Sequence, residues 1–266
     1  MSEARNRGNE PLNKVFDSIA LAVSDVSEGS SLCVGGFGLC GVPFALIDAI
    51  SQLSVGNFHV VSNNCGTDGT GLGILLAQRR ISRVTASYVG ENAEFARQYL
   101  AGELELELTP QGTLAERMRA GGCGIPAFFT PAGVGTVVGD GGLPWRYGAD
   151  GEVVSESPRK ETRQFNDRDY ILEESITTDF ALIHAAVADQ MGNLVFHEAA
   201  RNFNPLCAMA GKITIVEAEE IVVAGEIAPD DVQLPGIFVQ RVVQVPSGAT
   251  KPIERLTVRK PAEANR

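Results

Sequence analysis

A glycine-rich turn is the first feature of the sequence that suggests chemistry. Residues 36–41, Gly-Phe-Gly-Leu-Cys-Gly, fit the pattern G-x-G-x-x-G between a predicted strand and a predicted helix, which is the setting of a dinucleotide-binding loop. Such a loop also needs an acidic residue about twenty positions later, at the end of the second strand, to bind a ribose hydroxyl. Here the second predicted strand ends in Ser62-Asn63-Asn64, without a charge. The missing acidic residue disfavours a dinucleotide-dependent oxidoreductase, which stays an alternative function. A purely structural role of the turn also stays open.

Three amide side chains follow predicted strands. Asn63 and Asn64 stand at the carboxyl end of one strand, beside a glycine-rich loop, and Gln111 comes just after the predicted strand Leu104 to Leu108. Ligands of open α/β sheets bind in the crevice outside the carboxyl ends of the strands. Because amides in such places also cap turns, the residues alone leave a binding role and a structural role open.

Other reactive side chains lack the neighbours that nucleophilic or metal chemistry requires. Glu91 is predicted at the start of a helix, where the helix dipole favours a carboxylate without any catalytic role. Cys65 lies next to Asn64, but the sequence places no histidine to activate its thiol. The five cysteines and three histidines show no metal-ligand spacing. We therefore expect reduced thiols, no bound metal and structural histidines, which are His59, His184 and His197.

The elements that must position these groups alternate between strand and helix. Apolar runs predict strands at residues 32–34, 58–62, 84–88, 104–108, 180–188, 194–196, 213–216 and 238–245. Apolar positions at helical spacing predict helices at residues 13–26, 44–53, 72–78, 91–100 and 113–120. This order predicts an α/β fold with an open, largely parallel sheet covered by helices on both faces.

Two segments depart from the alternating pattern. Residues 180–188 and 194–196 are separated by Asp-Gln-Met-Gly-Asn, which predicts an antiparallel hairpin towards the C-terminal part. Residues 131–169 are rich in Gly, Pro and charge, and we expect them to form a long surface excursion that covers the sheet. No internal repeat or linker divides the chain. The predicted organisation is a disordered tail at 1–12, a single domain at 13–245 and a polar tail at 246–266.

Composition limits the classes of protein to which the chain belongs. Its 266 residues include 22 Lys and Arg against 33 Asp and Glu, a net charge of −11, and so acidic a surface repels phosphate backbones. No apolar run approaches the ~18 residues of a membrane span. The first dozen residues fit neither a secretory signal nor a transit peptide. These features predict a cytoplasmic protein without nucleic-acid or membrane partners.

The glycine turn is part of a longer pattern. The run LCVGGFGLCGVP at residues 32–43 resembles the glycine signature of the family I coenzyme A transferases. The resemblance covers roughly residues 28–260 and is to the first half, or A subunit, of the 3-oxoacid CoA-transferases that use succinyl-CoA. Further segments that carry it are SNNCGTDGTGLGILL, SYVGENAEFARQYLAGELELELTPQGTLAERMRAGG, ILEESITTDFALI, ARNFNPLC and IERLTVRK. Glu28 stands where the family usually has Asp or Asn, and we expect it to change only local hydrogen bonding.

The resemblance implies covalent catalysis shared between two subunits. In this family a glutamate attacks an acyl-CoA thioester, CoA attacks the resulting anhydride to give a glutamyl-CoA thioester, and a second carboxylic acid then takes the CoA in a ping-pong cycle. The glutamate lies in a Ser-Glu-Asn-Gly motif of the family's other half, and the nearest run here, Gly90-Glu91-Asn92-Ala93, ends in Ala. The chain is thus expected to be active only with a B subunit that carries the glutamate, most simply as two copies of each chain. Coenzyme A is a substrate in this scheme, and no cofactor is expected.

The same resemblance assigns roles within this chain. Asn63, Asn64 and Gln111 match active-site amides, which would polarise the carbonyl oxygen on which negative charge develops. Gly35, Gly36, Phe37 and Gly38 would form the wall against which the thioester packs. The expected acids are succinate, carried as succinyl-CoA, and a 3-oxo acid such as acetoacetate; 3-oxoadipate is the alternative acid, and a catalytically idle scaffold is the alternative role.

Overall fold

A mostly parallel sheet forms the centre of the molecule in the computed structural model, which describes residues 13–246 and 249. Within these residues the sheet has eight strands, and each pair of neighbours along its main path is parallel. From one edge to the other, the seven strands of the main path are β13 (Arg241–Gln244), β12 (Gly211–Val222), β10 (Thr178–Asp189), β1 (Ser31–Val34), β2 (Phe58–Val61), β3 (Ile81–Ala86) and β4 (Glu105–Leu108), and the eighth strand pairs only with β10. The chain builds outwards from β1 to β4 and then continues on the other side of β1 with β10, so the order of the strands reverses beside β1.

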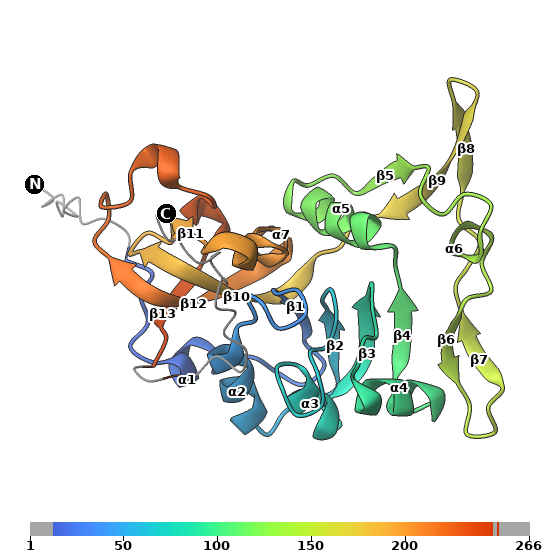
Figure 1. Cartoon of the computed structure of the whole chain (residues 1–266), viewed down its shortest axis with the longest axis horizontal. Helices are drawn as coiled ribbons and strands as arrows, with labels where there is room; N and C mark the ends of the chain where they lie inside the picture. Colours follow the sequence, from blue (N-terminus) through green and yellow to red (C-terminus); the bar gives the residue numbers. More distant parts are fainter. Residues whose placement is uncertain (1–12, 247–248, 250–266) are drawn as a thin grey trace, which may run out of the picture.

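Helices cover both faces of this sheet, as predicted (Figure 1). One face packs against α1 (Ile19–Ala22), α2 (Phe44–Gln52), α3 (Gly73–Ala77) and α4 (Ala93–Leu100). The opposite face packs against α5 (Gln111–Gly122) and α7 (Asn204–Ala210). Alternate residues of β1 enter the two cores. Leu32 and Val34 lie on the side of the sheet that α2 covers, Cys33 lies on the side that α5 covers, and all three are fully buried. Because β1 is buried on both faces of the sheet, its residues 32–34 form a continuous apolar run.

The predicted C-terminal hairpin is confirmed. β10 turns back at Asp189 and pairs antiparallel with β11 (Leu194–Val195). Asp189 holds the turn, since its carboxylate accepts hydrogen bonds from the backbone of Met191 and Asn193 and from the Asn193 amide. β10 is also the parallel neighbour of β1 and β12, which places the hairpin within the main sheet.

The segment predicted as a surface excursion contains regular structure. It includes α6 (Val137–Asp140), β6 (Pro144–Tyr147), β7 (Val153–Glu156) and β8 (Thr162–Phe165), and it is flanked by β5 (Ala127–Thr130) and β9 (Arg168–Glu174). These strands form two small antiparallel sheets, β5-β9-β8 and β6-β7. The expectation that this segment covers the sheet is wrong, because it extends beyond the edge strand β4, which β6 contacts (Figure 1).

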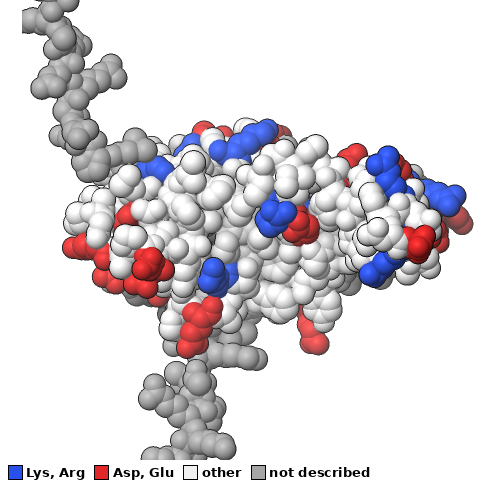
Figure 2. All heavy atoms as spheres, turned by 90° about the horizontal axis from the view of Figure 1, so that it is seen from above, with Lys and Arg blue, Asp and Glu red and all other residues white. Residues whose placement is uncertain are grey.

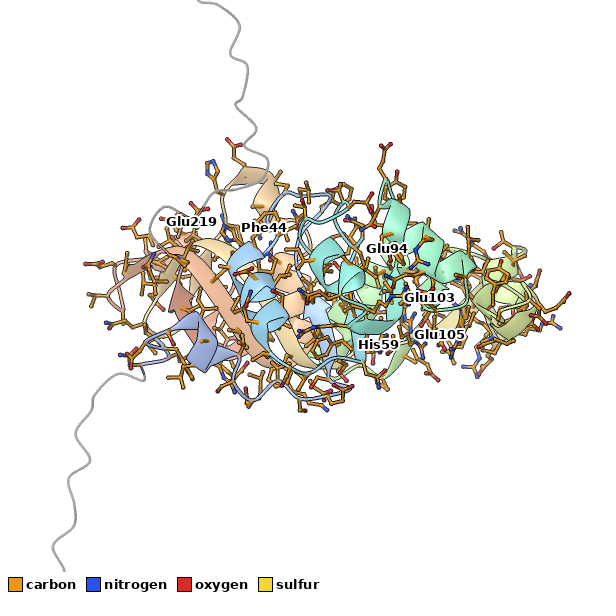
Figure 3. The ribbon with its side chains drawn as sticks, turned by 90° about the horizontal axis from the view of Figure 1, so that it is seen from below. Phe44, His59, Glu94, Glu103, Glu105 and Glu219 are labelled. Carbon is orange, nitrogen blue, oxygen red and sulfur yellow. The ribbon has the colours of Figure 1, made fainter. Side chains whose placement is uncertain are left out.

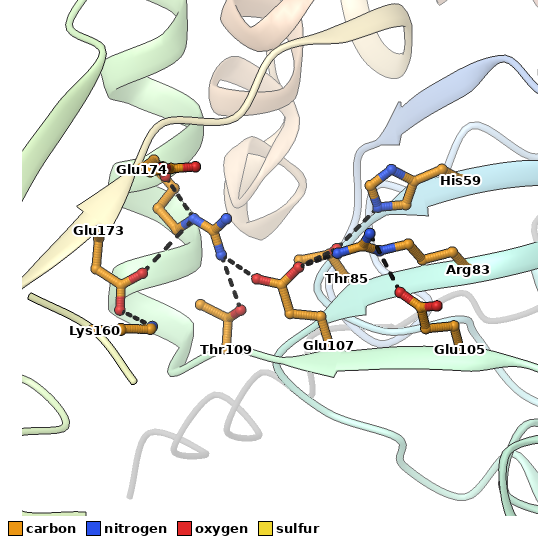
Figure 4. A network of polar contacts seen from close by, with 10 residues as sticks. His59, Arg83, Thr85, Glu105, Glu107, Thr109, Lys160, Glu173 and Glu174 are labelled. Carbon is orange, nitrogen blue, oxygen red and sulfur yellow. Dashed lines mark hydrogen bonds and ion pairs between the residues drawn. The ribbon is translucent and has the colours of Figure 1, made fainter. Parts of the chain in front are cut away.

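A series of charged side chains joins β9, which flanks the segment that extends beyond β4, to the main sheet (Figure 4). Arg117 of α5 donates to the Glu107 carboxylate of β4 at 2.6 Å and to the backbone oxygen of Glu174 in β9 at 2.7 Å. Glu107 also accepts a hydrogen bond from Arg83 of β3 at 2.9 Å. β3 and β4 therefore carry charged, partly exposed side chains on the α5 side of the sheet.

Several predicted boundaries are corrected by the structure. The helix predicted from residue 13 begins only at Ile19, and Ser18 caps it. The residues before it are not helical, because Val15 forms a parallel bridge with Val242 of β13. The strand predicted at 84–88 is displaced towards Ile81, and the strand predicted at 213–216 extends to Val222. The strand predicted at 238–245 is shorter, β13 beginning only at Arg241, and Phe238 belongs to a 3-10 turn at 236–238; residues 198–201 and 229–231 form further 3-10 turns.

The two predicted tails lie outside the described residues, apart from 246 and 249. Within the part of the chain that is described, no helix is both long and apolar enough to cross a membrane. β2, β3 and β4 point towards the top of the molecule in Figure 1. Figure 2 shows this face from above, and its middle carries few charged side chains.

Candidate active site

The glycine turn predicted after β1 lies at the carboxyl ends of the central strands, where the strand order reverses. Gly35 continues β1 by donating its N–H to the Leu182 oxygen of β10 at 2.9 Å. Phe37 and Cys40 then exchange two backbone hydrogen bonds of 3.0 Å, which close a tight turn. Gly38 within this turn has φ +59, a conformation that favours glycine. The backbone of the turn is therefore fixed by hydrogen bonds at the carboxyl end of β1.

Asn64 joins this turn to β2. Its Oδ1 accepts a hydrogen bond from the Gly38 N–H at 3.0 Å, and its Nδ2 donates to the Gly38 oxygen at 3.4 Å. The side chain is almost fully buried, with 8% exposed. The amide therefore fixes the position of the turn, and the turn fixes the orientation of the amide.

Asn63 and Gln111 continue the same network on the α5 side. Asn63 donates from Nδ2 to Asn64 Oδ1 at 3.1 Å, and its own Oδ1 accepts from Gln111 Nε2 at 2.8 Å and from the Ser87 hydroxyl at 2.7 Å. Gln111 is the first residue of α5, so three predicted amides from two distant segments meet in one hydrogen-bonded chain. Sequence reasoning missed Ser87, which follows β3 just as Asn63 follows β2.

The contacts of the network use only part of the donor capacity of the three amides. Each side-chain amide carries two N–H hydrogens, and the contacts of Asn63, Asn64 and Gln111 in the described residues engage one on each nitrogen. The oxygens of the two asparagines are engaged as acceptors, which sets the direction of both amide groups. Neutral donors held in this way can stabilise negative charge that develops on a carbonyl oxygen.

A small cleft opens beside these amides between the turn and the loop after β2. It is lined by Gly35, Gly36, Gly38, Ser62, Asn64, Gly66 and three apolar side chains. Gly36 has φ +113, and a Cβ there would lie 2.6 Å from a Val42 methyl carbon. Phe37, expected in the wall for the thioester, is 48% exposed. Glycine at position 36 is therefore required by packing within the turn, and the exposed ring of Phe37 is compatible with the predicted binding role.

Asn204 supports the turn from the opposite side and was not singled out in the sequence, although it lies in the segment ARNFNPLC. It is fully buried, and its Nδ2 donates to the oxygens of Gly41 and Ala200 at 2.9 and 2.7 Å. Its Oδ1 accepts the His184 backbone N–H at 3.0 Å. A Cβ on Gly35 would lie 2.0 Å from that oxygen. Glycine at position 35 is therefore required by this buried amide.

The remaining candidates occupy structural places. Glu91 is exposed in a turn before Asn92, which caps α4, so the helix begins two residues later than predicted. Burial raises the pKa of the Cys65 thiol to about 12, which disfavours the thiolate that nucleophilic attack needs. Burial, followed by the charge of Arg83, lowers the pKa of His59 to about 4. Glu28 accepts a hydrogen bond from the Gly56 N–H, a local contact of the expected kind.

Comparison with known proteins identifies relatives along most of the chain. A sequence profile described as coenzyme A transferase matches residues 16–245. A Mycobacterium bovis protein, named as the A subunit of a probable succinyl-CoA:3-ketoacid coenzyme A transferase, is 63% identical over 248 residues, which cover 93% of this chain and 100% of the relative. A Mus musculus protein named succinyl-CoA:3-ketoacid coenzyme A transferase 2A, mitochondrial, is 52% identical over 92% of this chain and 47% of its own length.

A solved structure shares the fold. The apoenzyme of an acyl-CoA transferase from Escherichia coli O157:H7 superimposes with a TM-score of 0.74 at 22% identity, over 89% of this chain and 48% of that one. At this identity the likeness concerns the fold alone, and it agrees with the predicted parallel sheet.

Proposed function

Since the chain belongs to the coenzyme A transferase family, we propose that it is the A subunit of a 3-oxoacid CoA-transferase that moves CoA from succinyl-CoA to a 3-oxo acid such as acetoacetate. The observation that carries this proposal is the 63% identity to a relative of that name, over that relative's whole length. The hydrogen-bonded side-chain amides at the carboxyl ends of the strands support the proposal, because neutral donors of this kind suit the chemistry of acyl transfer.

The proposed reaction begins on a glutamate of a partner B subunit. Its carboxylate attacks the thioester carbonyl, the carbonyl oxygen becomes negatively charged, and collapse of this intermediate expels the CoA thiolate and leaves a mixed anhydride. The thiolate then attacks the glutamyl carbonyl, which releases the free acid and leaves a glutamyl-CoA thioester. The 3-oxo acid repeats both steps in reverse order and departs as its CoA ester.

This chain supplies donors for the oxygens that become charged. Asn63, Asn64 and Gln111 would each offer an amide N–H from a network in which both asparagine oxygens are already engaged as acceptors. Because these groups are neutral, they do not form a salt bridge with the attacking carboxylate, whose nucleophilicity is preserved. Because they are fixed before substrate binds, little reorganisation is needed when charge develops. The turn at Gly35, Gly36, Phe37 and Gly38 forms the adjoining wall for the thioester.

The wider assembly belongs to the same proposal. Two copies of this chain and two of the B subunit would form the active enzyme, most simply around a two-fold axis. CoA would enter and leave as a substrate, with no resident cofactor, and the cytoplasm is the proposed compartment. In the described residues, the three amides bond to one another, to Gly38 and to Ser87 but to no carboxylate, which is compatible with a glutamate supplied by another chain.

The proposal is tested by producing the chain with and without a partner that contains Ser-Glu-Asn-Gly. Formation of acetoacetyl-CoA from succinyl-CoA and acetoacetate is expected from the pair and not from this chain alone. Activity of the isolated chain would place the nucleophile here and contradict the proposal. A higher kcat/KM with 3-oxoadipate than with acetoacetate would favour the alternative acid, and NADH binding in a fluorescence titration would favour the dinucleotide alternative.

A further inference from the structure

A buried histidine with two carboxylates lies behind the glycine turn, and the proposed reaction does not use it. His184 of β10 faces Glu217 and Glu219 of the adjacent strand β12. Its Nδ1 is 2.9 Å from Glu217 Oε1 and its Nε2 is 2.8 Å from Glu219 Oε1. Glu217 is 2% exposed and His184 is buried, whereas Glu219 is exposed. A hydrogen-bonded histidine and carboxyl group therefore lie inside the core, on the side of the sheet that α2 covers.

Glu217 connects this pair to the start of α2. Its Oε2 accepts the backbone N–H of Leu46 at 2.8 Å, and Leu46 is fully buried. The residue that precedes the helix, Pro43, has no side chain that can cap these N–H groups. A carboxylate from another strand replaces the missing cap and complements the helix dipole. Figure 3 shows Glu219 and Phe44, the first residue of α2, on the same side of the molecule.

His184 also reaches the glycine turn through its backbone. Its N–H donates to Asn204 Oδ1, and Asn204 Nδ2 donates to the Gly41 oxygen. The segment from Gly41 to Leu46 is thus held at both ends by groups that converge on His184. This segment is the direct continuation of the turn that contains Gly38, whose N–H is bonded to Asn64.

We propose that His184 and Glu217 are positioning residues for CoA transfer: they fix the segment between the glycine turn and α2, and through Gly38 they fix the direction of the Asn64 amide. The proposal rests on the proposed function, because it needs Asn64 to serve the reacting carbonyl. Neither residue touches substrate in this scheme. Their effect reaches the reaction through the polypeptide between residues 38 and 46.

The charge state required for this arrangement follows from the two contacts. Both ring nitrogens of His184 face carboxylate oxygens, so both must donate, which only the imidazolium can do. Burial by itself would lower the pKa of His184, but the hydrogen bonds and charges of Glu217 and then Glu219 outweigh it and raise that pKa. The imidazolium satisfies both carboxylates, including the one that caps α2.

The experiment uses the complex of this chain with its B-type partner. Glu217→Leu removes both the charge and the acceptor for the Leu46 N–H, whereas Glu217→Gln keeps an oxygen that can accept it. Glu220→Gln, at an exposed position of the same strand, is the matched control. A displacement of about 1 Å at a catalytic group can cost ~10²-fold in rate. We expect Glu217→Leu to lower kcat by ten- to a hundred-fold with KM changed less than three-fold, Glu217→Gln to recover most of this loss, and Glu220→Gln to leave kcat unchanged.

A double-mutant cycle with Asn64→Ala separates positioning from general loosening of the fold. If Glu217 acts through Asn64, its replacement by Leu has little further effect on kcat once Asn64 is Ala. Equal losses of kcat in both backgrounds would overturn the proposal, as would normal kcat in a Glu217→Leu complex that folds. If Glu217→Leu does not assemble, the same cycle is run with His184→Gln, which keeps a donor but carries no charge.

The cycle also distinguishes this inference from the proposed function. Normal turnover in the Asn64→Ala complex alone would contradict the role given to the amide and the inference with it. Reduced turnover in Asn64→Ala combined with full additivity would contradict only the inference. Non-additivity together with rescue by Glu217→Gln supports both.

Discussion

Replacing the two outermost amides separately tests whether they serve the transition state or only the turn. Asn64→Ala and Gln111→Ala each remove one neutral donor at the same edge of the sheet. Loss of such a donor typically lowers kcat by ~10²–10³-fold, about 2.7–4 kcal/mol of transition-state stabilisation. If both amides act on the reacting carbonyl, both variants should lose activity to a similar degree.

Their effects on stability should differ, because the two side chains sit in different surroundings. Asn64 is buried and makes two hydrogen bonds to Gly38 and one with Asn63. At about 1 kcal/mol for each bond, its loss should cost roughly 2–3 kcal/mol. Gln111 is exposed and makes one such bond, to Asn63, so its loss should cost about 1 kcal/mol or less.

The assay measures kcat, KM for both substrates and thermal unfolding of the assembled complex. We expect large, similar losses of kcat, small changes in KM and a larger drop in melting temperature for Asn64→Ala. Activity losses that follow the stability losses, with Gln111→Ala nearly normal, would refute a catalytic role for Gln111. Near-normal turnover in both variants would remove these two amides from the mechanism and favour a scaffold.

Three further outcomes follow from the structure. Glu91→Gln should leave turnover within about two-fold of the parent, since Glu91 is exposed before the α4 cap, and failure to trap a glutamyl-CoA adduct in this variant would contradict that. Because the pKa of His59 is lowered to about 4 from 6.5, the folded state loses stability as pH falls from about 6.5 to about 4, by at most ~3 kcal/mol. His59→Gln should lack this loss in denaturant unfolding, and identical pH profiles would refute it. Gly35→Ala should destabilise by about 3 kcal/mol or more, because its Cβ would lie 2.0 Å from Asn204 Oδ1. Gly112→Ala, with no atom within 4 Å of the added Cβ, should be neutral or slightly stabilising in the same unfolding assay.

The parts of the fold that the sequence predicted well are those with one dominant local signal. The continuous apolar run of β1 and the glycine turn after it predicted a buried parallel strand and a sharp change of direction, and both are present. The amides Asn63, Asn64 and Gln111 could be proposed from their places after strands, and the structure brings them together. Their distance in sequence prevented any prediction of which amide bonds to which.

The errors arise where a distant contact outweighs the local pattern. Val15 has helical spacing with later apolar residues, but its bridge to Val242 holds it beside the sheet. β12 was predicted too short because Glu217 and Glu219 interrupt its apolar pattern, and only the fold shows that His184 faces both. Asn204 looks like an ordinary loop residue until Gly41 and His184 are placed beside it. Such compensation between distant residues has no signal at local spacing.

In the proposed enzyme this chain provides the polarising amides and a partner provides the nucleophile. The most direct measurement is the intact mass of both polypeptides after the assembled enzyme is mixed with succinyl-CoA and rapidly denatured. We expect a CoA adduct, bound as a thioester, on the partner and none on this chain, and slower appearance of that adduct when Asn64 is replaced by Ala. An adduct on this chain would contradict the proposed division of roles, and so would an unchanged rate of adduct formation in the Asn64→Ala complex.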